Sequence, residues 1–243
     1  EAIIASPDVA GVSFTGSVAT GRAIAAKLVG RMAKVQLEMG GKNPLVVLDD
    51  ADLNVAVNAA IQGAYYSTGQ RCTASSRLIV TQGIHDRFVR ALSERLAALK
   101  VDDALAPGTD IGPVVDESQL AQDLEYVGIG KAEGAKLAAG GERLSRAKDG
   151  YYFAPALFTE TTNDMRIARE EIFGPVAAVI RAKDYDEALA LANDTEFGLC
   201  TGIVTTSLKH ASHFRRHAQA GMVMVNLPTA GVDYHVPFGG RKG

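Results

Sequence analysis

The sequence is poor in cysteine and has no surplus of basic residues. Its two cysteines, Cys72 and Cys200, lie in different sequence contexts, so we do not expect a disulfide between them. Two thiols without a disulfide framework are typical of a reducing compartment, and we expect a cytoplasmic protein. The formal net charge is −3 at pH 7, which argues against a nucleic-acid-binding protein because such proteins usually carry a basic surplus.

Long apolar runs are missing as well. No run approaches the roughly 18 apolar residues that cross a bilayer as a helix, so we expect no membrane span. With 47% hydrophobic and 22% charged residues, the composition is that of an ordinary globular protein. The 243 residues suffice for one large domain or two modest ones.

The glycine-rich phosphate-binding loop of nucleotide-hydrolysing enzymes is also absent. Gly41-Lys42 resembles the end of that motif, but Gln36 stands where its first glycine is required. Asn43 follows the lysine in place of the serine or threonine that the motif needs. We therefore exclude a nucleotide site of this kind.

Histidine spacing suggests a metal site at first sight. His210, His213 and His217 share one face of a predicted helix. However, the cationic Arg215 and Arg216 lie between them, and no acidic ligand is near in the sequence. A solvated helix face explains the pattern better, and we expect no metal.

What the sequence does contain is a regular alternation of apolar, β-branched runs with helical patterns. Such alternation predicts an α/β fold with a mostly parallel sheet. The run Leu45–Leu48 is apolar throughout, as in a strand covered on both faces, and Asp52 is placed to cap the helix that follows. Strands are predicted at 12–15, 33–37, 45–48, 77–81, 176–181, 199–205 and 223–226, and helices at 18–29, 53–66, 84–100, from 116 or 118 to about 130, 188–192 and 208–217.

The clearest candidate domain boundary is Gly40-Gly41, where a predicted strand ends in two glycines. Residues 1–40 then form the remnant of a first domain, and residues 41–243 form a full second domain. The chain begins at Glu1 without a methionine and stops in the glycine-rich segment Phe238–Gly243. We therefore expect a fragment of a longer protein.

The segment around Cys72 is the first that indicates chemistry. Gly69 allows a tight turn before the cysteine, and Arg71 adjoins it. We also expect helical turns after Cys72. A cationic neighbour and a helix N-terminus would both favour the nucleophilic thiolate over the thiol. On this local pattern, a catalytic nucleophile and a buried structural cysteine both stay open. Cys200 begins an apolar strand, and we expect it to be structural.

Three further segments place polar groups at the ends of predicted elements. Glu38 ends a strand at the carboxyl edge of its sheet, where it is either a general base or a salt-bridge partner. Gly16 and Ser17 open a helix, either as a phosphate cradle of backbone N–H groups or as an ordinary N-cap. Glu171 and Phe173 precede a strand, in either a binding loop or a plain strand entry.

Together and in this order, these segments resemble the aldehyde dehydrogenase superfamily over essentially the whole chain. Each motif has moderate specificity alone, but five in this order are highly specific. The resemblance implies the fold of that family, with residues 1–40 as the end of a Rossmann-like NAD(P)-binding domain and residues 41–243 as the catalytic domain. The motifs that carry it are Phe14–Ser17, Glu38–Lys42, Gly69–Cys72, Glu171–Pro175 and Pro237–Gly240.

The resemblance also implies roles for individual residues. Cys72 matches the catalytic cysteine and Glu38 the general base. Ser17 matches the serine that contacts the cofactor pyrophosphate. Glu171 matches the glutamate that holds the nicotinamide ribose, and Phe173 the aromatic residue beside the nicotinamide.

Other residues match the supporting parts of the family's site. Gln119 matches a polar residue near the adenosine ribose, and Asn226 matches an asparagine that supports the active site from the strand before the last loop. The remaining expected contacts are Gly16 and Gly40 with the cofactor, and Arg71 and Phe238 as support for the substrate site.

The implied reaction is the oxidation of an aldehyde to a carboxylic acid with NAD or NADP. The Cys72 thiolate adds to the carbonyl, hydride transfer leaves a thioester, and Glu38 activates the water that hydrolyses it. The last loop, residues 226–235, is most similar to that of the α-ketoglutarate semialdehyde dehydrogenases. Within it, Asp233, Tyr234 and His235 face either the substrate or the surface.

The sequence also departs from the family. Family members are much longer, and the cofactor-contacting lysine, the asparagine of the oxyanion site and the C-terminal pairing segment are absent. We expect that the chain alone binds NAD(P) poorly and turns over slowly or not at all. The full-length protein is expected to be a homo-oligomer, either a dimer or a tetramer.

Competing interpretations remain. In a coenzyme A-acylating dehydrogenase a thiol resolves the thioester, but such enzymes usually lack the glutamate base that matches Glu38. A cysteine hydrolase needs a histidine base near Cys72, and His85 is the nearest in sequence. A non-catalytic fragment of the enzyme is the third alternative.

Overall fold

The computed structural model describes residues 2–231 and 233–242. The chain forms two compact units, Glu1–Gly40 and Gly41–Gly243. The first unit contains α1 (Ala2–Ala5), β1 (Gly11–Gly16), α2 (Val18–Val29) and β2 (Lys34–Met39). Its two strands are parallel, with Thr15 opposite Glu38 and Gly16 opposite Met39. The α2 helix packs on this pair, where Gly21 leaves room for the Met39 side chain.

The second unit is built on a seven-stranded sheet with the order β11-β10-β3-β4-β9-β8-β5. Every neighbouring pair is parallel except β5 with β8. The predicted α/β fold with a mostly parallel sheet is therefore confirmed. The strands of this sheet are β3 (Asn43–Val47), β4 (Ser75–Thr81), β5 (Lys136–Ala139), β8 (Ala156–Thr161), β9 (Val176–Ala182), β10 (Cys200–Val204) and β11 (Met222–Val225).

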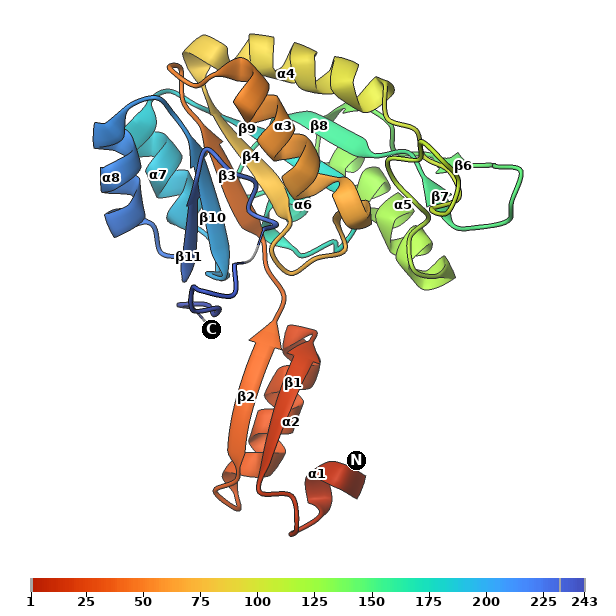
Figure 1. Cartoon of the computed structure of the whole chain (residues 1–243), viewed down its shortest axis with the longest axis vertical. Helices are drawn as coiled ribbons and strands as arrows, with labels where there is room; N and C mark the ends of the chain where they lie inside the picture. The colour runs from red at the N-terminus through yellow and green to blue at the C-terminus, as the bar shows by residue number, and fades with distance from the viewer. Residues whose placement is uncertain (1, 232, 243) are drawn as a thin grey trace. The chain divides into compact units, whose positions relative to one another are not determined.

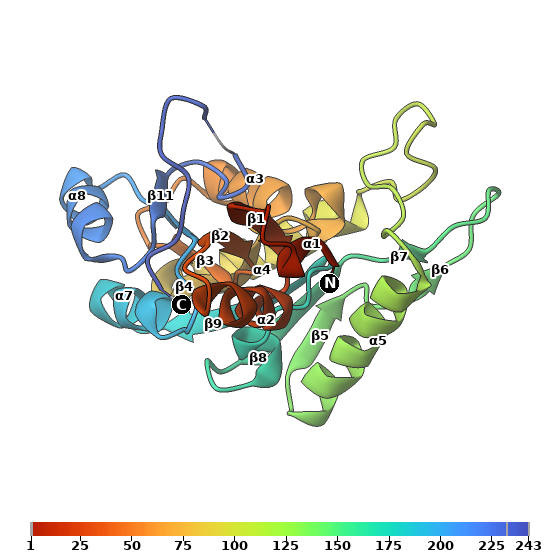
Figure 2. The same cartoon turned by 90° about the horizontal axis from the view of Figure 1, so that it is seen from below.

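Helices cover both faces of this sheet (Figure 1). One face carries α3 and α4 and the other α7 and α8, while α5 lies beside β5 (Figure 2). A short antiparallel pair, β6 (Arg143–Leu144) with β7 (Tyr152–Phe153), lies outside the sheet. The helices are α3 (Leu53–Ala64), α4 (Gln82–Ala97), α5 (Glu117–Ala132), α6 (Arg166–Arg169), α7 (Tyr185–Asn193) and α8 (Leu208–His217), with a short 3₁₀ segment, η1 (Tyr66–Gly69).

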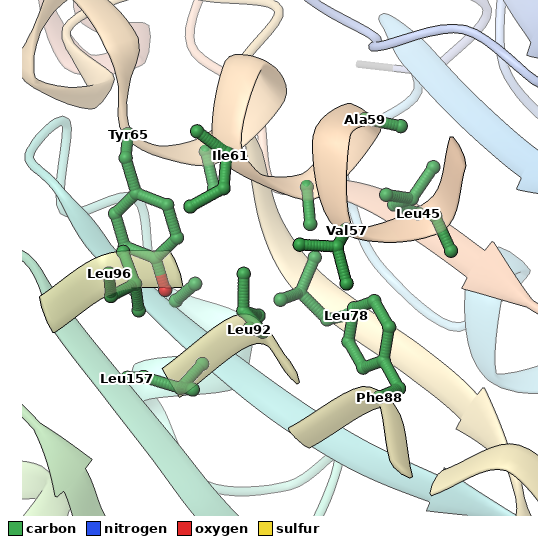
Figure 3. Packing of buried hydrophobic residues seen from close by; sticks show 14 of the residues in the cluster. Leu45, Val57, Ala59, Ile61, Tyr65, Leu78, Phe88, Leu92, Leu96 and Leu157 are labelled. Carbon is green, nitrogen blue, oxygen red and sulfur yellow. The ribbon is translucent and has the colours of Figure 1, made fainter. Parts of the chain in front are cut away.

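The alternation of side chains along the central strands explains why both faces are covered. Leu45 and Leu78 point into the core beneath α3 and α4, which also contains Phe88 of α4 (Figure 3). Val46 and Ile79, one residue further along each strand, belong to the core beneath α7 and α8. Strands that are apolar at every position therefore bury both of their faces, as expected for a parallel sheet.

Several predicted elements have the observed bounds, and others were missed. The helices at 18–29 and 208–217 are confirmed residue for residue. Asp52 caps α3 as predicted, since its carboxylate accepts a hydrogen bond from the N–H of Val55 at 3.0 Å. The strands between 136 and 161 and the short α6 were not predicted. Within the described part of the chain, no helix is both long and apolar enough to cross a membrane.

Candidate active site

Cys72, Glu171 and Phe173, three of the predicted site residues of the second unit, lie just before strands. Gly41 precedes β3, Cys72 precedes β4, and Glu171 and Phe173 precede β9. These three strands are parallel neighbours, so their first residues meet at one edge of the sheet, which we call the amino edge. Open α/β sheets usually bind ligands at the opposite, carboxyl edge. The candidate site of this unit therefore lies at the less usual end of the strands.

Cys72 lies in a tight turn between η1 and β4. Ala74 donates to the carbonyl of Arg71 at 3.0 Å, which closes the turn around the cysteine. Gly69 has a φ of +64°, and a side chain there would meet the carbonyl of Gly174, so a glycine is required. The prediction of helical turns after Cys72 is wrong, because the extended strand β4 begins at Ser75.

The Arg71 side chain bonds to the backbone before the cysteine turn. Its guanidinium donates to the carbonyl oxygens of Gln62 and Tyr66, the latter at 2.9 Å. The Gln62 carbonyl lies in the last turn of α3, where the carbonyls have no N–H partner within the helix, and Tyr66 begins η1. Arg71 thus ties the cysteine turn to α3, while the expected effect of its charge on the Cys72 thiolate stays a prediction.

A carboxamide that the sequence analysis did not select also holds the turn. Asn43, only 2% exposed at the start of β3, donates through Nδ2 to the carbonyls of Cys72 at 2.8 Å and Ala74 at 2.9 Å. Its Oδ1 accepts from the N–H of Cys200 at 3.1 Å. The signal in the sequence was a polar side chain opening an otherwise apolar strand, directly before a proline.

The loop before β9 lies against the cysteine turn. The Glu171 carboxylate accepts a hydrogen bond from the N–H of Gly41 at 2.8 Å, and burial raises its pKa above the ordinary value. Phe173 has a φ of +58° and stays 41% exposed. A small cavity is shared by the two segments, and its lining includes Gly41, Gly69, Arg71, Glu171 and Phe173.

Gln119 supports this loop from α5. Its Nε2 donates to the carbonyl of Ile172 at 3.1 Å and to the carboxylate of Asp123 at 2.9 Å. The neighbouring Gln122 donates to the same Ile172 carbonyl at 2.6 Å. The structure thus gives Gln119 a role in holding the loop, while its contact with a cofactor stays a prediction.

Asn226 lies at the carboxyl edge, away from Cys72. It follows β11 with a φ of +56°, and its side chain exchanges two hydrogen bonds with the backbone of Thr205, at 2.9 and 3.0 Å. The chain then turns back, and the Thr229 hydroxyl donates to the carbonyl of Thr73 at 2.7 Å. Any support that Asn226 gives to the cysteine turn is therefore indirect, through this returning loop.

The rest of the last loop is largely exposed. Asp233, Tyr234 and His235 are exposed in this chain, and Val232 lies outside the described residues. Phe238 is 40% exposed. Gly239, which follows it, packs against Gly221 before β11, so this end of the loop lies at the amino edge.

The remaining candidates belong to the first unit. Ser17 is the N-cap of α2, since its hydroxyl accepts from the N–H of Thr20 at 3.3 Å. The N–H groups of Val18 and Ala19 lie in the first turn, where no helix carbonyl is available to them. Gly16 and Glu38 stand at the carboxyl ends of β1 and β2, and Gly40 ends the unit.

Two expectations from the sequence can be tested against this geometry: the structural role of Cys200, and a cysteine hydrolase with His85 as its base. Cys200 is 2% exposed, its thiol donates to the carbonyl of Thr229 at 3.5 Å, and burial raises its pKa to about 12, so its structural role is confirmed. His85 lies on α4, beyond the carboxyl end of β4. The seven residues of β4 separate it from Cys72, roughly 20 Å at 3.3 Å per residue. A cysteine hydrolase with this histidine as base is therefore excluded.

The histidine face of α8 is occupied by ring contacts. His210 stacks on Tyr185 at 4.5 Å between ring centroids, and His213 stacks on His217 at 3.8 Å. Among residues 2–231 and 233–242, no three His, Cys, Asp or Glu side chains are grouped as ligands for a metal ion.

Comparison with known proteins places this chain in a family. The sequence model of the aldehyde dehydrogenase family matches residues 1–243. The chain is 47% identical over 233 residues to the alpha-ketoglutaric semialdehyde dehydrogenase of Bacillus subtilis, covering 95% of this chain and 48% of that protein. It is 45% identical over 248 residues to the 2,5-dioxopentanoate dehydrogenase of Saccharolobus solfataricus, covering 100% of this chain and 50% of that protein.

A solved structure agrees with these sequence matches. The betaine aldehyde dehydrogenase of Staphylococcus aureus in complex with NAD⁺ is similar with a TM-score of 0.93 at 36% identity, over 96% of this chain and 46% of that chain. The chain spans about half the length of the curated relatives it matches. From the family match over the full sequence and the shared fold, we conclude that the chain belongs to the aldehyde dehydrogenase family.

Proposed function

We propose that this chain supplies the nucleophile and the general base of an NAD(P)-dependent aldehyde dehydrogenase, as its catalytic domain and the end of its cofactor domain. The observation that carries the proposal is the turn that holds Cys72 at the amino edge. The Asn43 side chain of β3 holds the backbone of this turn, the Arg71 side chain ties the turn to the end of α3 and the start of η1, and the Glu171 loop lies against it. Cys200, by contrast, is only 2% exposed.

The proposed chemistry begins at the sulfur. The Cys72 thiolate forms a bond to the aldehyde carbon, and the carbonyl oxygen becomes an oxyanion. The backbone N–H of Cys72 is one donor to that oxyanion, a contact worth roughly 3 kcal/mol in comparable sites. Oxidation of this thiohemiacetal leaves a thioester on Cys72. Glu38 then takes a proton from water, whose oxygen attacks the thioester carbon, so that the acid leaves and the thiol is restored.

The residues that the family resemblance assigns to the cofactor fit a dinucleotide. The first turn of α2 offers the N–H groups of Val18 and Ala19 to an anion, as a pyrophosphate requires. The partly exposed Phe173 offers an aromatic surface, and the Glu171 carboxylate is oriented by Gly41 to accept ribose hydroxyls. When bound, the oxidised nicotinamide supplies the acceptor for the hydride. The structure of the Staphylococcus aureus relative contains NAD⁺.

The substrate that we propose is α-ketoglutarate semialdehyde, which is also named 2,5-dioxopentanoate. Two relatives at 45 and 47% identity carry these names. A cytoplasmic location and a homo-oligomer, both expected from the sequence, stay predictions.

The test replaces each cysteine in the intact protein. Cys72→Ala removes the nucleophile, so we expect aldehyde oxidation to fall by at least about a thousandfold. Cys200→Ala is the matched control, because it removes a buried thiol from the same edge of the sheet, and its rate is expected to stay within a few-fold. Steady-state reduction of NAD⁺ with the semialdehyde measures both. Retention of activity in Cys72→Ala would refute the proposed function.

A further inference from the structure

We propose that Asn43 of β3 is a positioning residue for Cys72, whose buried carboxamide links the cysteine turn to β3 and to the start of β10. The inference rests on the proposed function, in which Cys72 is the nucleophile. It concerns the backbone around the sulfur and involves no contact between Asn43 and the substrate.

The carboxamide of Asn43 uses its hydrogen-bonding capacity on the backbone. Both donors of Nδ2 are used, by the carbonyls of Cys72 and Ala74, and Oδ1 accepts from the N–H of Cys200. The first two partners lie before β4 and the third begins β10. Since β3 runs between β4 and β10, one side chain joins three neighbouring strands at the amino edge.

A side chain is needed here because the backbone ladder is interrupted. Pro44 has no N–H to donate, and the pairing of β3 with β4 shifts register between Asn43 and Pro44. On the other side, the pairing of β3 with β10 begins only at Leu45, opposite Gly202. The Asn43 side chain therefore makes the contacts that the main chain cannot make at this level of the sheet.

The consequence for Cys72 is a fixed backbone. Its carbonyl is held by Asn43, that of Thr73 by the Thr229 hydroxyl at 2.7 Å, and that of Ala74 again by Asn43. Gly41 permits this close packing, since a side chain there would meet the Cys72 carbonyl oxygen. Three successive carbonyls are thus held by two side chains, and the cysteine is preorganised before the substrate arrives.

The chemistry of the carboxamide allows a graded test. Asn43→Ser keeps one hydroxyl donor, so at most one of the two carbonyls stays bound. Asn43→Asp keeps the shape but replaces the donor with an oxygen that repels both carbonyls. Asn193 provides the matched control, because its carboxamide also bridges backbone groups, donating to His217 at 3.0 Å and accepting from Gln219 at 2.8 Å.

Two measurements on the intact protein decide the question. Hydrogen–deuterium exchange of the peptide that covers residues 69–75 reports the turn itself. We expect exchange about tenfold faster in Asn43→Ser and faster still in Asn43→Asp. In steady-state kinetics, kcat is expected to fall about tenfold in Asn43→Ser and further in Asn43→Asp, with KM within about threefold. Asn193→Ser and Asn193→Asp should change neither measurement by more than about twofold.

Other results would overturn the positioning role of Asn43. If Asn43→Ser exchanges at the unmodified rate, or if its exchange rises while kcat stays within twofold, the positioning role is overturned. A fall in kcat that the Asn193 variants share would also overturn it. Asn43→Ser decides the question alone if Asn43→Asp does not fold. Absence of aldehyde oxidation in the unmodified protein would instead refute the proposed function, while the exchange data would still report on the turn.

Discussion

At the scale of single residues, the surroundings of Cys72 are built from groups that lie far apart in the sequence. Cys72 stands out because its motif occurs in order with four others. The sequence places Arg71 beside Cys72, but only the fold shows that the guanidinium donates to the carbonyl of Gln62 in α3. Asn43 was overlooked for the same reason, since its three partners lie 29, 31 and 157 residues away along the chain.

The buried carboxyl of Asp123 leads to a prediction about stability and pH. Burial raises its pKa to about 7, and its Oδ2 has no hydrogen-bond partner. The folded state therefore keeps a proton that the unfolded chain releases near its ordinary value of 3.8. Because the unfolded state binds fewer protons between these values, the free energy of unfolding falls as the pH rises from about 4 to 7, by roughly 1.4 kcal/mol per pKa unit.

Asp123→Asn should remove this pH dependence, because the amide resembles the protonated carboxyl. We expect the variant to be more stable than the unmodified protein by a few kcal/mol at pH 8, and the advantage to disappear near pH 4. Urea unfolding at pH 4 and at pH 8 measures the difference in the free energy of unfolding between the variant and the unmodified protein. The exposed Asp149→Asn is the control, for which we expect no such difference. Equal pH dependence in Asp123→Asn and the unmodified protein would contradict the account.

At the scale of elements, long periodic segments could be predicted and short ones could not. The helices at 18–29 and 208–217 have clear starts, with Ser17 and Ser207 as N-caps. The strand β5 has only four residues and two alanines, so its sequence carries almost no pattern. The order and register of the strands could not be predicted either, because a strand's neighbours are determined by packing. Only the fold therefore shows that Cys72, Glu171 and Phe173 lie at the same amino edge of the sheet.

The packing of α4 on the sheet leads to a prediction for a whole element. Phe88 is fully buried between α4 and the strands (Figure 3). Phe88→Ala leaves a cavity that the neighbouring side chains fill only in part, so we expect a loss of about 3–5 kcal/mol in the free energy of unfolding. Urea denaturation measures this loss. Leu105, which is 87% exposed, is the control, since Leu105→Ala should change stability by less than about 0.5 kcal/mol. A loss below about 1 kcal/mol for Phe88→Ala would mean that α4 contributes little to the core.

At the scale of the whole chain, the two units bring different parts of the proposed reaction. The second unit holds Cys72 in the turn that the Asn43 and Thr229 side chains fix, together with the Glu171 loop. The first carries Glu38 and the Ser17-capped helix on a parallel strand pair. Both assignments derive from family motifs, and the comparisons support the family over the full sequence. The proposed roles of the Cys72 sulfur and the Glu38 carboxylate can therefore be tested by separating thioester formation from thioester hydrolysis.

The most direct test of the account traps the thioester. In the intact protein, Glu38→Gln should still form the thioester but hydrolyse it slowly, because the base that activates water is missing. Mixing the variant with the semialdehyde and NAD⁺ should give a rapid burst of NADH followed by slow turnover. Mass spectrometry of the acid-quenched protein should then find the acyl group on the peptide that contains Cys72. An acyl group on Cys200, or a protein that oxidises the aldehyde without a burst or an adduct, would contradict the assignment of Cys72 as the nucleophile.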